Sequence, residues 1–198
     1  MIGIVDYGCG NLMSVANSLE FLGFDCFVSS DAEELSGADG LILPGVGAFP
    51  AAMDMLVASG LVGCVKEFPR PLLGICLGMQ LLFSVGEEVR ECAGLGLVPG
   101  RVKLIGTELK LPHIGWNSLS LRGTSPLFRG VPDGSFVYFV HSFAGAADDP
   151  ADVAAVTDYG TEVLAAVSRG NVHGCQFHPE KSGDTGLKIL KNFAELCV

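Results

Sequence analysis

The spacing of apolar residues in the first half of the chain alternates between that of buried strands and that of helices. Short apolar runs without a polar face predict strands, and between them apolar residues recur every three or four positions, as on one face of a helix. Gly23 directly follows the first helical stretch, where a glycine commonly ends a helix. The alternation indicates a doubly wound α/β fold with a mostly parallel central sheet flanked by helices. The expected strands are residues 2–5, 26–28, 41–43 and 71–75, and the expected helices are residues 12–22, 49–59 and 78–83.

The second half of the chain has a different pattern. From Leu95 to Val172, short apolar runs are separated by Gly, Pro and Asp, which predicts a smaller antiparallel extension. The clearest strands there are residues 136–140 and 172–177, and helical spacing returns at residues 187–196. Because no linker, low-complexity tract or internal repeat interrupts the chain, we expect a single domain over residues 1–198.

Composition and charge exclude several classes of protein. Hydrophobic residues make up 49% of the chain and charged residues 17%, which is too apolar for a disordered segment. The formal net charge of -10 would repel nucleic acid and anionic membranes, so neither is an expected partner. The stretch Pro71–Phe83 falls short of the roughly 20 apolar residues that cross a bilayer, and the N-terminus lacks the pattern of a signal peptide. We therefore expect a cytoplasmic protein.

The cysteines do not form a recognisable framework. There are 7, at scattered positions and without CxxC pairs, so neither a set of disulfides nor a structural metal site is expected. Most of them are expected to be small, reduced core residues. One of them has a distinctive setting.

Cys76 lies at the junction of the strand at residues 71–75 and the helix that follows it, between Gly74 and Gly78. Small flanking residues permit the tight turn of a nucleophile elbow, which presents its central side chain. Free N–H groups at the start of a helix favour a thiolate over a thiol. By itself, this motif fits a buried structural cysteine equally well.

A second motif supplies a base and a group to orient it. His178 and Glu180 lie two residues apart, so in an extended segment their side chains share a face. The imidazole could accept the proton of Cys76 while Glu180 holds its other ring nitrogen, as in a catalytic triad. A loop histidine beside a solvated glutamate is the alternative when this motif is considered alone. The two motifs together favour catalysis.

Two further features follow strand ends. Gly45, Val46 and Gly47 could turn a backbone N–H toward an oxyanion, beside the N–H of Leu77. Gln80 lies one helical turn after the cysteine and places an amide in an otherwise apolar run. An ordinary loop would also explain the glycines, whereas a buried amide needs a partner such as a polar substrate.

Motifs spread over nearly the whole chain resemble one known family. They are DYGCGNL at residues 6–12, PGVGAF at 44–49, GICLGMQLLF at 74–83, GLGLVPG at 94–100, PHIGWN at 112–117, YFVHS at 138–142 and QFHPEKS at 176–182. The pattern resembles the class I, triad-type glutamine amidotransferases, and in particular the glutaminase subunits of imidazole glycerol phosphate synthases in histidine biosynthesis. The resemblance implies no metal and no organic cofactor.

The resemblance also implies a reaction and a partner. Cys76 would attack glutamine to form a glutamyl thioester, ammonia would leave after protonation by His178, and water would release glutamate. The ammonia would pass to a (βα)8-barrel cyclase subunit, which forms imidazole glycerol phosphate and aminoimidazole carboxamide ribotide.

By the same resemblance, Gln80 and the backbone around Ser142 and Phe143 would bind glutamine. The residues expected near the cyclase interface are Asn11, Trp116, Asn117, Tyr138 and Lys181. The aromatic pair fits core packing as well as contact with a partner.

Some residues depart from the family pattern, although none belongs to the proposed triad. Cys9 stands where methionine is expected, Phe143 where tyrosine is common, and Ser84, Val85 and Gly86 replace a more acidic turn.

Three alternatives remain open from the sequence. The chain could supply ammonia to another synthase, of the aminodeoxychorismate or anthranilate type. It could be a cysteine hydrolase that acts without a partner on peptides or γ-glutamyl conjugates. It could also be a binding or redox-sensing protein that uses Cys76 without catalysis.

Overall fold

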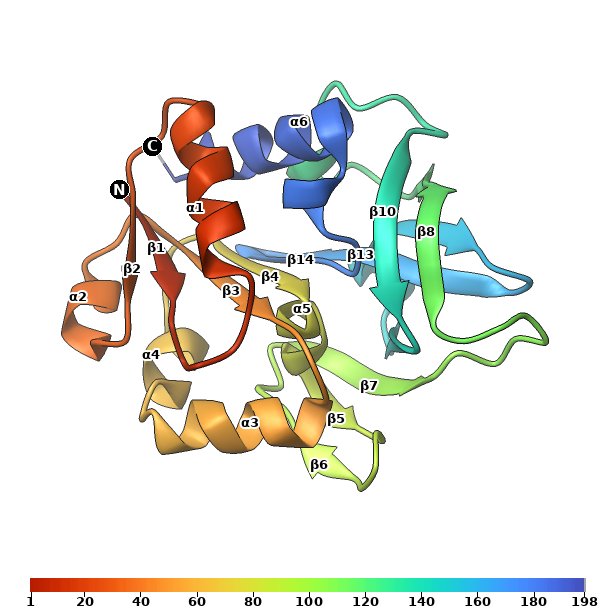
Figure 1. The fold of residues 1–198 in the computed structure, drawn as a ribbon, viewed down its shortest axis with the longest axis horizontal. Helices are drawn as coiled ribbons and strands as arrows, with labels where there is room; N and C mark the ends of the chain where they lie inside the picture. The colour runs from red at the N-terminus through yellow and green to blue at the C-terminus, as the bar shows by residue number, and fades with distance from the viewer. Residues whose placement is uncertain (198) are drawn as a thin grey trace.

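The computed structural model of the chain describes residues 1–197 and has a sheet of eight strands at its centre (Figure 1). Its strands are β1 (Ile2–Val5), β2 (Cys26–Ser29), β3 (Gly40–Gly45), β4 (Leu72–Cys76), β9 (Ser120–Leu121), β12 (Val153–Asp158), β13 (Glu162–Arg169) and β14 (Val172–Cys175). Their order in the sheet is β2-β1-β3-β4-β14-β13-β12-β9. The first five strands in this order are parallel, and the remaining pairs are antiparallel. The predicted α/β class with a mostly parallel core is thus confirmed.

Helices cover both faces of the parallel strands (Figure 1). They are α1 (Leu12–Phe21), α2 (Ala32–Ser36), α3 (Phe49–Ala58), α4 (Val62–Lys66), α5 (Leu77–Leu81) and α6 (Gly183–Ala194). Neighbouring residues of a strand point to opposite faces, so Ile42 packs with α1 and α6, whereas Leu41 and Leu43 pack with α2, α3 and α4. Strands β1, β3 and β4 are therefore apolar at every position, as the sequence indicated.

Two smaller sheets extend this core. One has the order β11-β7-β5-β6, and the other is the antiparallel pair of β10 and β8. The strands are β5 (Phe83–Gly86), β6 (Cys92–Ala93), β7 (Val98–Leu104), β8 (His113–Ser118), β10 (Phe136–His141) and β11 (Phe143–Ala147). Short 3-10 helices at Pro126–Phe128, Pro150–Asp152 and Pro179–Lys181 complete the secondary structure of the described part.

Two of the expected elements need correction. The helix predicted at residues 78–83 ends at Leu81, and Phe83 begins strand β5. The carbonyl groups of Leu81 and Leu82 accept hydrogen bonds from the backbone N–H groups of residues 95, 97 and 98, which replaces a further helical turn. The strand predicted at residues 172–177 ends at Cys175 and pairs in parallel with β4, so it belongs to the central sheet and not to the antiparallel extension.

The topology brings the expected site residues to one edge of the sheet. Gly45 and Cys76 are register partners at the ends of β3 and β4, and Ile75 pairs with Cys175 at the end of β14. His178 follows β14 by three residues. The carboxyl ends of parallel strands are the usual location of a ligand site in such sheets. Within residues 1–197, no helix is long and apolar enough to span a membrane.

Candidate active site

Cys76 occupies a strained turn between β4 and α5. Its φ of 55° is unusual for a residue with a side chain, and the side chain is 7% exposed. The flanking glycines make the turn possible, because a Cβ atom on Gly78 would lie 1.8 Å from the carbonyl oxygen of Leu43. A Cβ atom on Gly74 would lie 2.7 Å from the carbonyl oxygen of Gly78. The helix must approach β3 this closely, so the elbow geometry predicted from the spacing of these glycines is present.

His178 lies between Cys76 and Glu180. The distance from Nδ1 of His178 to Oε1 of Glu180 is 2.8 Å, and the two side chains are 3% and 1% exposed. Asn11 brings its Nδ2 atom to 3.5 Å from the same carboxylate oxygen. The 3-10 turn at Pro179–Lys181 begins directly after His178, the imidazole is bonded to Glu180, and Cys76 lines the same pocket as His178.

The surroundings of His178 favour its protonated form. Burial lowers the pKa of the imidazole, but hydrogen bonding to Cys76 and Glu180 and electrostatic attraction to these two groups outweigh burial and raise the pKa to about 9. At neutral pH the ring therefore carries a proton close to the sulfur atom. This is the arrangement that a proton donor to a leaving amine requires.

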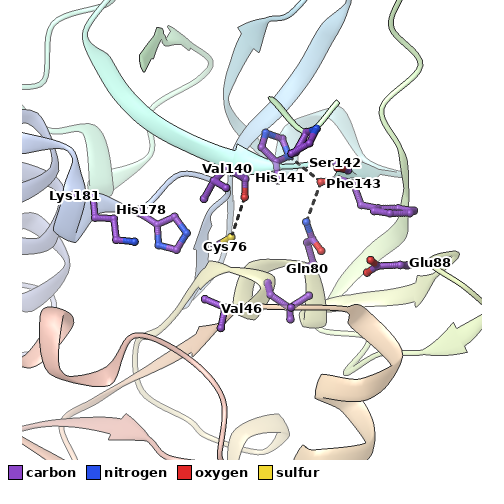
Figure 2. A pocket seen from close by; sticks show the side chains of 13 residues that line it. Val46, Cys76, Gln80, Glu88, Val140, His141, Ser142, Phe143, His178 and Lys181 are labelled. Atoms are coloured by element: carbon purple, nitrogen blue, oxygen red, sulfur yellow. Dashed lines mark hydrogen bonds between the residues drawn. The ribbon is translucent and has the colours of Figure 1, made fainter. Parts of the chain in front are cut away.

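A pocket of about 330 Å³ opens beside the sulfur atom (Figure 2). Gln80 lies in its wall and donates a hydrogen bond from Nε2 to the carbonyl oxygen of Phe143, at 2.9 Å. Ser142 and Phe143 line the pocket with His178, so the predicted glutamine-binding residues surround the space beside the thiol. The pocket is also lined by Val46, Gly47, Cys76, Leu77, Glu88, Pro112, Val140, His141 and Lys181.

The loop predicted to complete an oxyanion hole borders this pocket, but its backbone is engaged elsewhere. The N–H of Val46 points to Sγ of Cys9 at 3.4 Å, and the thiol of Cys9 donates to the carbonyl oxygen of Val46 at 2.8 Å. Tyr7 donates from its hydroxyl to the carbonyl oxygen of Pro44, at 2.9 Å. In this conformation the N–H of Val46 is not available to an oxyanion, and its predicted role requires the loop to rearrange.

The residues expected at a partner interface fall into two groups. Trp116 is 55% exposed and meets Tyr138 edge to face, with ring centroids 6.1 Å apart, so it is not a core residue. Lys181 is exposed at the rim of the pocket. Asn117 instead directs its amide inward and donates to the carbonyl oxygen of Asp158 at 2.7 Å.

The structure adds residues that the sequence did not single out. Glu88 brings the carboxylate found in the wall of the pocket, near Gln80 and Phe143 in Figure 2. Gln176 is fully buried, and its Nε2 atom lies 3.8 Å from Sγ of Cys76. A polar residue inside the apolar run that leads to His178 was the available signal for Gln176. No comparable signal distinguished Glu88 from the glutamates around it.

Comparisons with known proteins agree with this geometry. The profile of the family Glutamine amidotransferase class-I matches residues 3–196. The imidazole glycerol phosphate synthase subunit HisH of Bacillus cereus (strain ATCC 14579) is 52% identical over 196 residues, which cover 98% of this chain and 93% of that protein. The HisH subunit of Bacillus thuringiensis (strain Al Hakam) is also 52% identical, with the same coverage.

A solved glutamine amidotransferase has the same fold, with a TM-score of 0.78 at 20% identity over 99% of this chain and 98% of that chain. A profile match over nearly all residues, together with 52% identity to full-length relatives, establishes the family. The chain therefore belongs to the class I glutamine amidotransferases and, within them, to the HisH subunits of imidazole glycerol phosphate synthase.

Proposed function

We propose that this glutaminase subunit hydrolyses glutamine with the triad Cys76, His178 and Glu180 and supplies ammonia to a cyclase subunit in histidine biosynthesis. The observation that carries the proposal is the position of His178, which is hydrogen-bonded to the buried carboxylate of Glu180 and lines the same pocket as the elbow cysteine. Membership among the HisH subunits supports the substrate and the pathway. We also propose that the subunit acts in the cytoplasm.

In this proposal the triad residues act in two stages. The sulfur atom of Cys76 attacks the carboxamide carbon of glutamine, and a C–S bond forms as the carbonyl oxygen gains negative charge. His178 gives its proton to the amide nitrogen, the C–N bond breaks, and ammonia leaves a glutamyl thioester. The neutral imidazole then takes a proton from water, which attacks the thioester and releases glutamate and the thiol. Glu180 holds the ring and stabilises its charge throughout.

The pocket offers complementary groups to both ends of glutamine. With both Nε2 hydrogens directed to Phe143 and Gln176, Gln80 has its Oε1 atom free to accept from the substrate. The carboxylate of Glu88, on the side of the pocket away from Lys181 in Figure 2, suits the α-ammonium group. Backbone groups of Ser142 and Phe143 complete the binding site in this proposal.

The proposed partner is a (βα)8-barrel cyclase, and an apolar surface beside the active site suits it. Ile114, Trp116 and Phe136 lie on β8 and β10 and are 58%, 55% and 56% exposed. These residues occupy alternate positions, so they share one face of the two-stranded sheet. Val140, on the same strand as Phe136, lines the catalytic pocket. A partner seated on this face would cover the site and receive ammonia directly.

Glutamine hydrolysis measured with and without the cyclase, and with the cyclase ligand present, tests the proposal. We expect slow hydrolysis by the isolated chain, because the N–H of Val46 is bonded to Cys9 and does not face the oxyanion, and strong stimulation by the liganded cyclase. The Cys76→Ala variant should lose hydrolysis and still fold and bind the cyclase. Fast turnover by the isolated chain, indifferent to the partner, would instead favour a stand-alone hydrolase.

A further inference from the structure

Gln176 is a buried polar residue that the reaction described above does not use. Its side chain is 0% exposed, and its amide lies between two groups of the active site. Oε1 is 3.0 Å from Nε2 of Gln80, and Nε2 is 3.8 Å from Sγ of Cys76. An amide buried beside a nucleophile must be held in one of two orientations, and only one of them presents an N–H to the sulfur.

The hydrogen bonds around Gln80 determine this orientation. The carbonyl oxygen of Phe143 can only accept, so Gln80 must face it with its NH2 group, at 2.9 Å. The second hydrogen of the same group is directed to Gln176, which must then present its oxygen. The NH2 group of Gln176 is consequently left to face Cys76.

A pair of buried histidines holds the carbonyl oxygen of Phe143 from the other side. Nδ1 of His141 lies 2.8 Å from that oxygen and must carry the hydrogen. Nε2 of His141 lies 3.2 Å from Nδ1 of His113, and with a neutral ring it accepts from that atom. Burial lowers the pKa of His141 to about 4 and also lowers the pKa of His113, so both rings are neutral at pH 7.

The orientation of the groups at the far end of this hydrogen-bond network is also determined. Nε2 of His113 is left as an acceptor and faces Nδ2 of Asn117 at 3.4 Å. The amide of Asn117 is oriented by its own backbone bonds, because its Oδ1 accepts from the N–H of Ser118 at 2.8 Å. The ring of His113 is stacked on Tyr159, with centroids 3.9 Å apart. Strand β8, through this network, orients the amides beside the nucleophile.

Besides His178, two polar groups lie near the sulfur atom, and they favour different protonation states. The carbonyl oxygen of Val140, 4.0 Å from Sγ, can accept from a thiol but would repel a thiolate (Figure 2). The N–H of Gln176 donates to sulfur, and such a bond strengthens when the acceptor is charged and buried. The hydrogen bond from Gln176 to Cys76 is therefore strongest when the cysteine is a thiolate, which is its reactive form.

From these contacts we propose that Gln176 is a further catalytic residue, whose side-chain N–H stabilises the thiolate of Cys76, and that Gln80, Phe143, His141 and His113 hold its amide in the required orientation. The proposal rests on the proposed function, because it assumes that Cys76 is the nucleophile. It assigns a chemical role to a residue of the QFHPEKS motif outside the triad.

The variant Gln176→Met removes the donor and keeps an unbranched side chain of similar length. In the complex with the cyclase, we expect kcat for glutamine to fall about ten-fold or more, because the thiolate loses one hydrogen bond to a charged group and is less populated, with KM changed less than about two-fold. In the isolated chain, alkylation of Cys76 by iodoacetamide at pH 7 should slow, and its pH profile should move to higher pH. Peptide mass spectrometry separates Cys76 from the other thiols, with Cys64 as the internal reference.

Asn192→Leu is the matched control. Asn192 is a buried amide that donates to the backbone of Leu127 and Arg129, away from the pocket, so its loss should lower stability and leave kcat and the alkylation of Cys76 unchanged. If Gln176→Met does not fold, a measurement on the chain with Gln176 intact still tests the contact. In a chain whose glutamine residues are labelled with ¹⁵N, NMR should show a side-chain proton of Gln176 shifting downfield as Cys76 loses its proton. The same proton should not shift in Cys76→Ala.

Two results would overturn the role of Gln176. One is an unchanged alkylation profile, or an amide signal that does not respond to Cys76. The other is a rise in KM with an unchanged kcat, which would mean that Gln176 only supports the binding amide of Gln80. Because alkylation and the amide signal need no turnover, absence of glutamine hydrolysis in the wild-type complex would count against the proposed function and not against this contact.

Discussion

The thiol of Cys9 holds both backbone polar groups of Val46, donating to its carbonyl oxygen and accepting from its N–H. Val46 belongs to the loop that borders the catalytic pocket, and its N–H is the group expected to face an oxyanion. Cys9 stands 37 positions earlier, in the turn that leads from β1 to α1. The side chain of one turn residue thus stabilises the loop in a conformation that leaves the oxyanion hole incomplete.

Replacing Cys9 by Ala should therefore release the loop. We expect glutamine hydrolysis by the isolated chain to rise about five-fold, the effect of losing roughly one net hydrogen bond that favours the resting state. The rate of the cyclase complex should change little, since the loop is already rearranged there. Steady-state ammonia release, measured for the wild type and Cys9→Ala as isolated chains and as cyclase complexes, gives these rates.

Cys64→Ala serves as the control for Cys9→Ala. Cys64 is also partly exposed, and its thiol makes one long contact, 3.6 Å, to the carbonyl oxygen of Ala32 away from the pocket. An isolated Cys9→Ala chain that is no faster than Cys64→Ala would show that the thiol does not restrain the loop.

The close contact between α5 and β3 predicts a large difference between two glycine substitutions. Gly78→Ala would place a Cβ atom 1.8 Å from the carbonyl oxygen of Leu43, so we expect a loss of about 3 kcal/mol or more in the free energy of unfolding. Gly63→Ala adds a Cβ atom in open space within helix α4 and should gain about 0.5 to 1 kcal/mol. Urea unfolding of both variants provides the comparison, and equal stabilities would contradict it.

Glu88 predicts a specific effect on substrate affinity. Glu88→Gln removes the charge that would attract the α-ammonium group and keeps an oxygen for the N–H of Phe49, which Glu88 accepts at 2.8 Å. We expect KM for glutamine to rise about ten-fold, as when a hydrogen bond to a charged group is lost, with kcat of the complex nearly unchanged. The neighbouring Glu87 pairs with Arg101 outside the pocket, so Glu87→Gln is the matched control and should leave KM unaltered.

His173 predicts how stability depends on pH. Its ring is buried, with Nδ1 2.8 Å from Oγ of Ser168, and burial lowers its pKa from 6.5 to about 4. Below pH 6.5 the imidazole of His173 is protonated in the unfolded chain but stays neutral in the folded chain. The stability present above pH 6.5 is therefore lost as the pH falls toward 4. The loss is on the order of 3 kcal/mol for such a group.

Burial gives His141 a similarly lowered pKa, so the wild type should lose stability through both groups. His173→Gln should lose distinctly less between pH 7 and pH 4.5, as measured by urea unfolding at the two values. Equal losses in the variant and the wild type would mean that His173 does not contribute.

Local sequence patterns were sufficient for the first four strands of the central sheet and for the elbow. The apolar run before Cys76 and the glycines around it specify a buried strand, a sharp turn and a helix start, and each depends on contacts between near neighbours. The limits of this information are visible at Phe83, which reads as helical and lies in a strand. Its pairing with Val98 outweighs its local spacing.

The relationships that govern reactivity were decided only by the tertiary structure. The hydrogen bonds between Cys9 and Val46 join residues 37 positions apart. The contact between Gln176 and Cys76 joins residues 100 positions apart. The order and register of the parallel strands determine which strand ends meet. The spacing of apolar residues within one strand specifies neither the order nor the register. The sequence by itself therefore determined which side chains can do chemistry. Strand order and register decided which of those side chains lie within hydrogen-bonding distance, because such contacts require atoms from distant segments to be placed within a few tenths of an ångström.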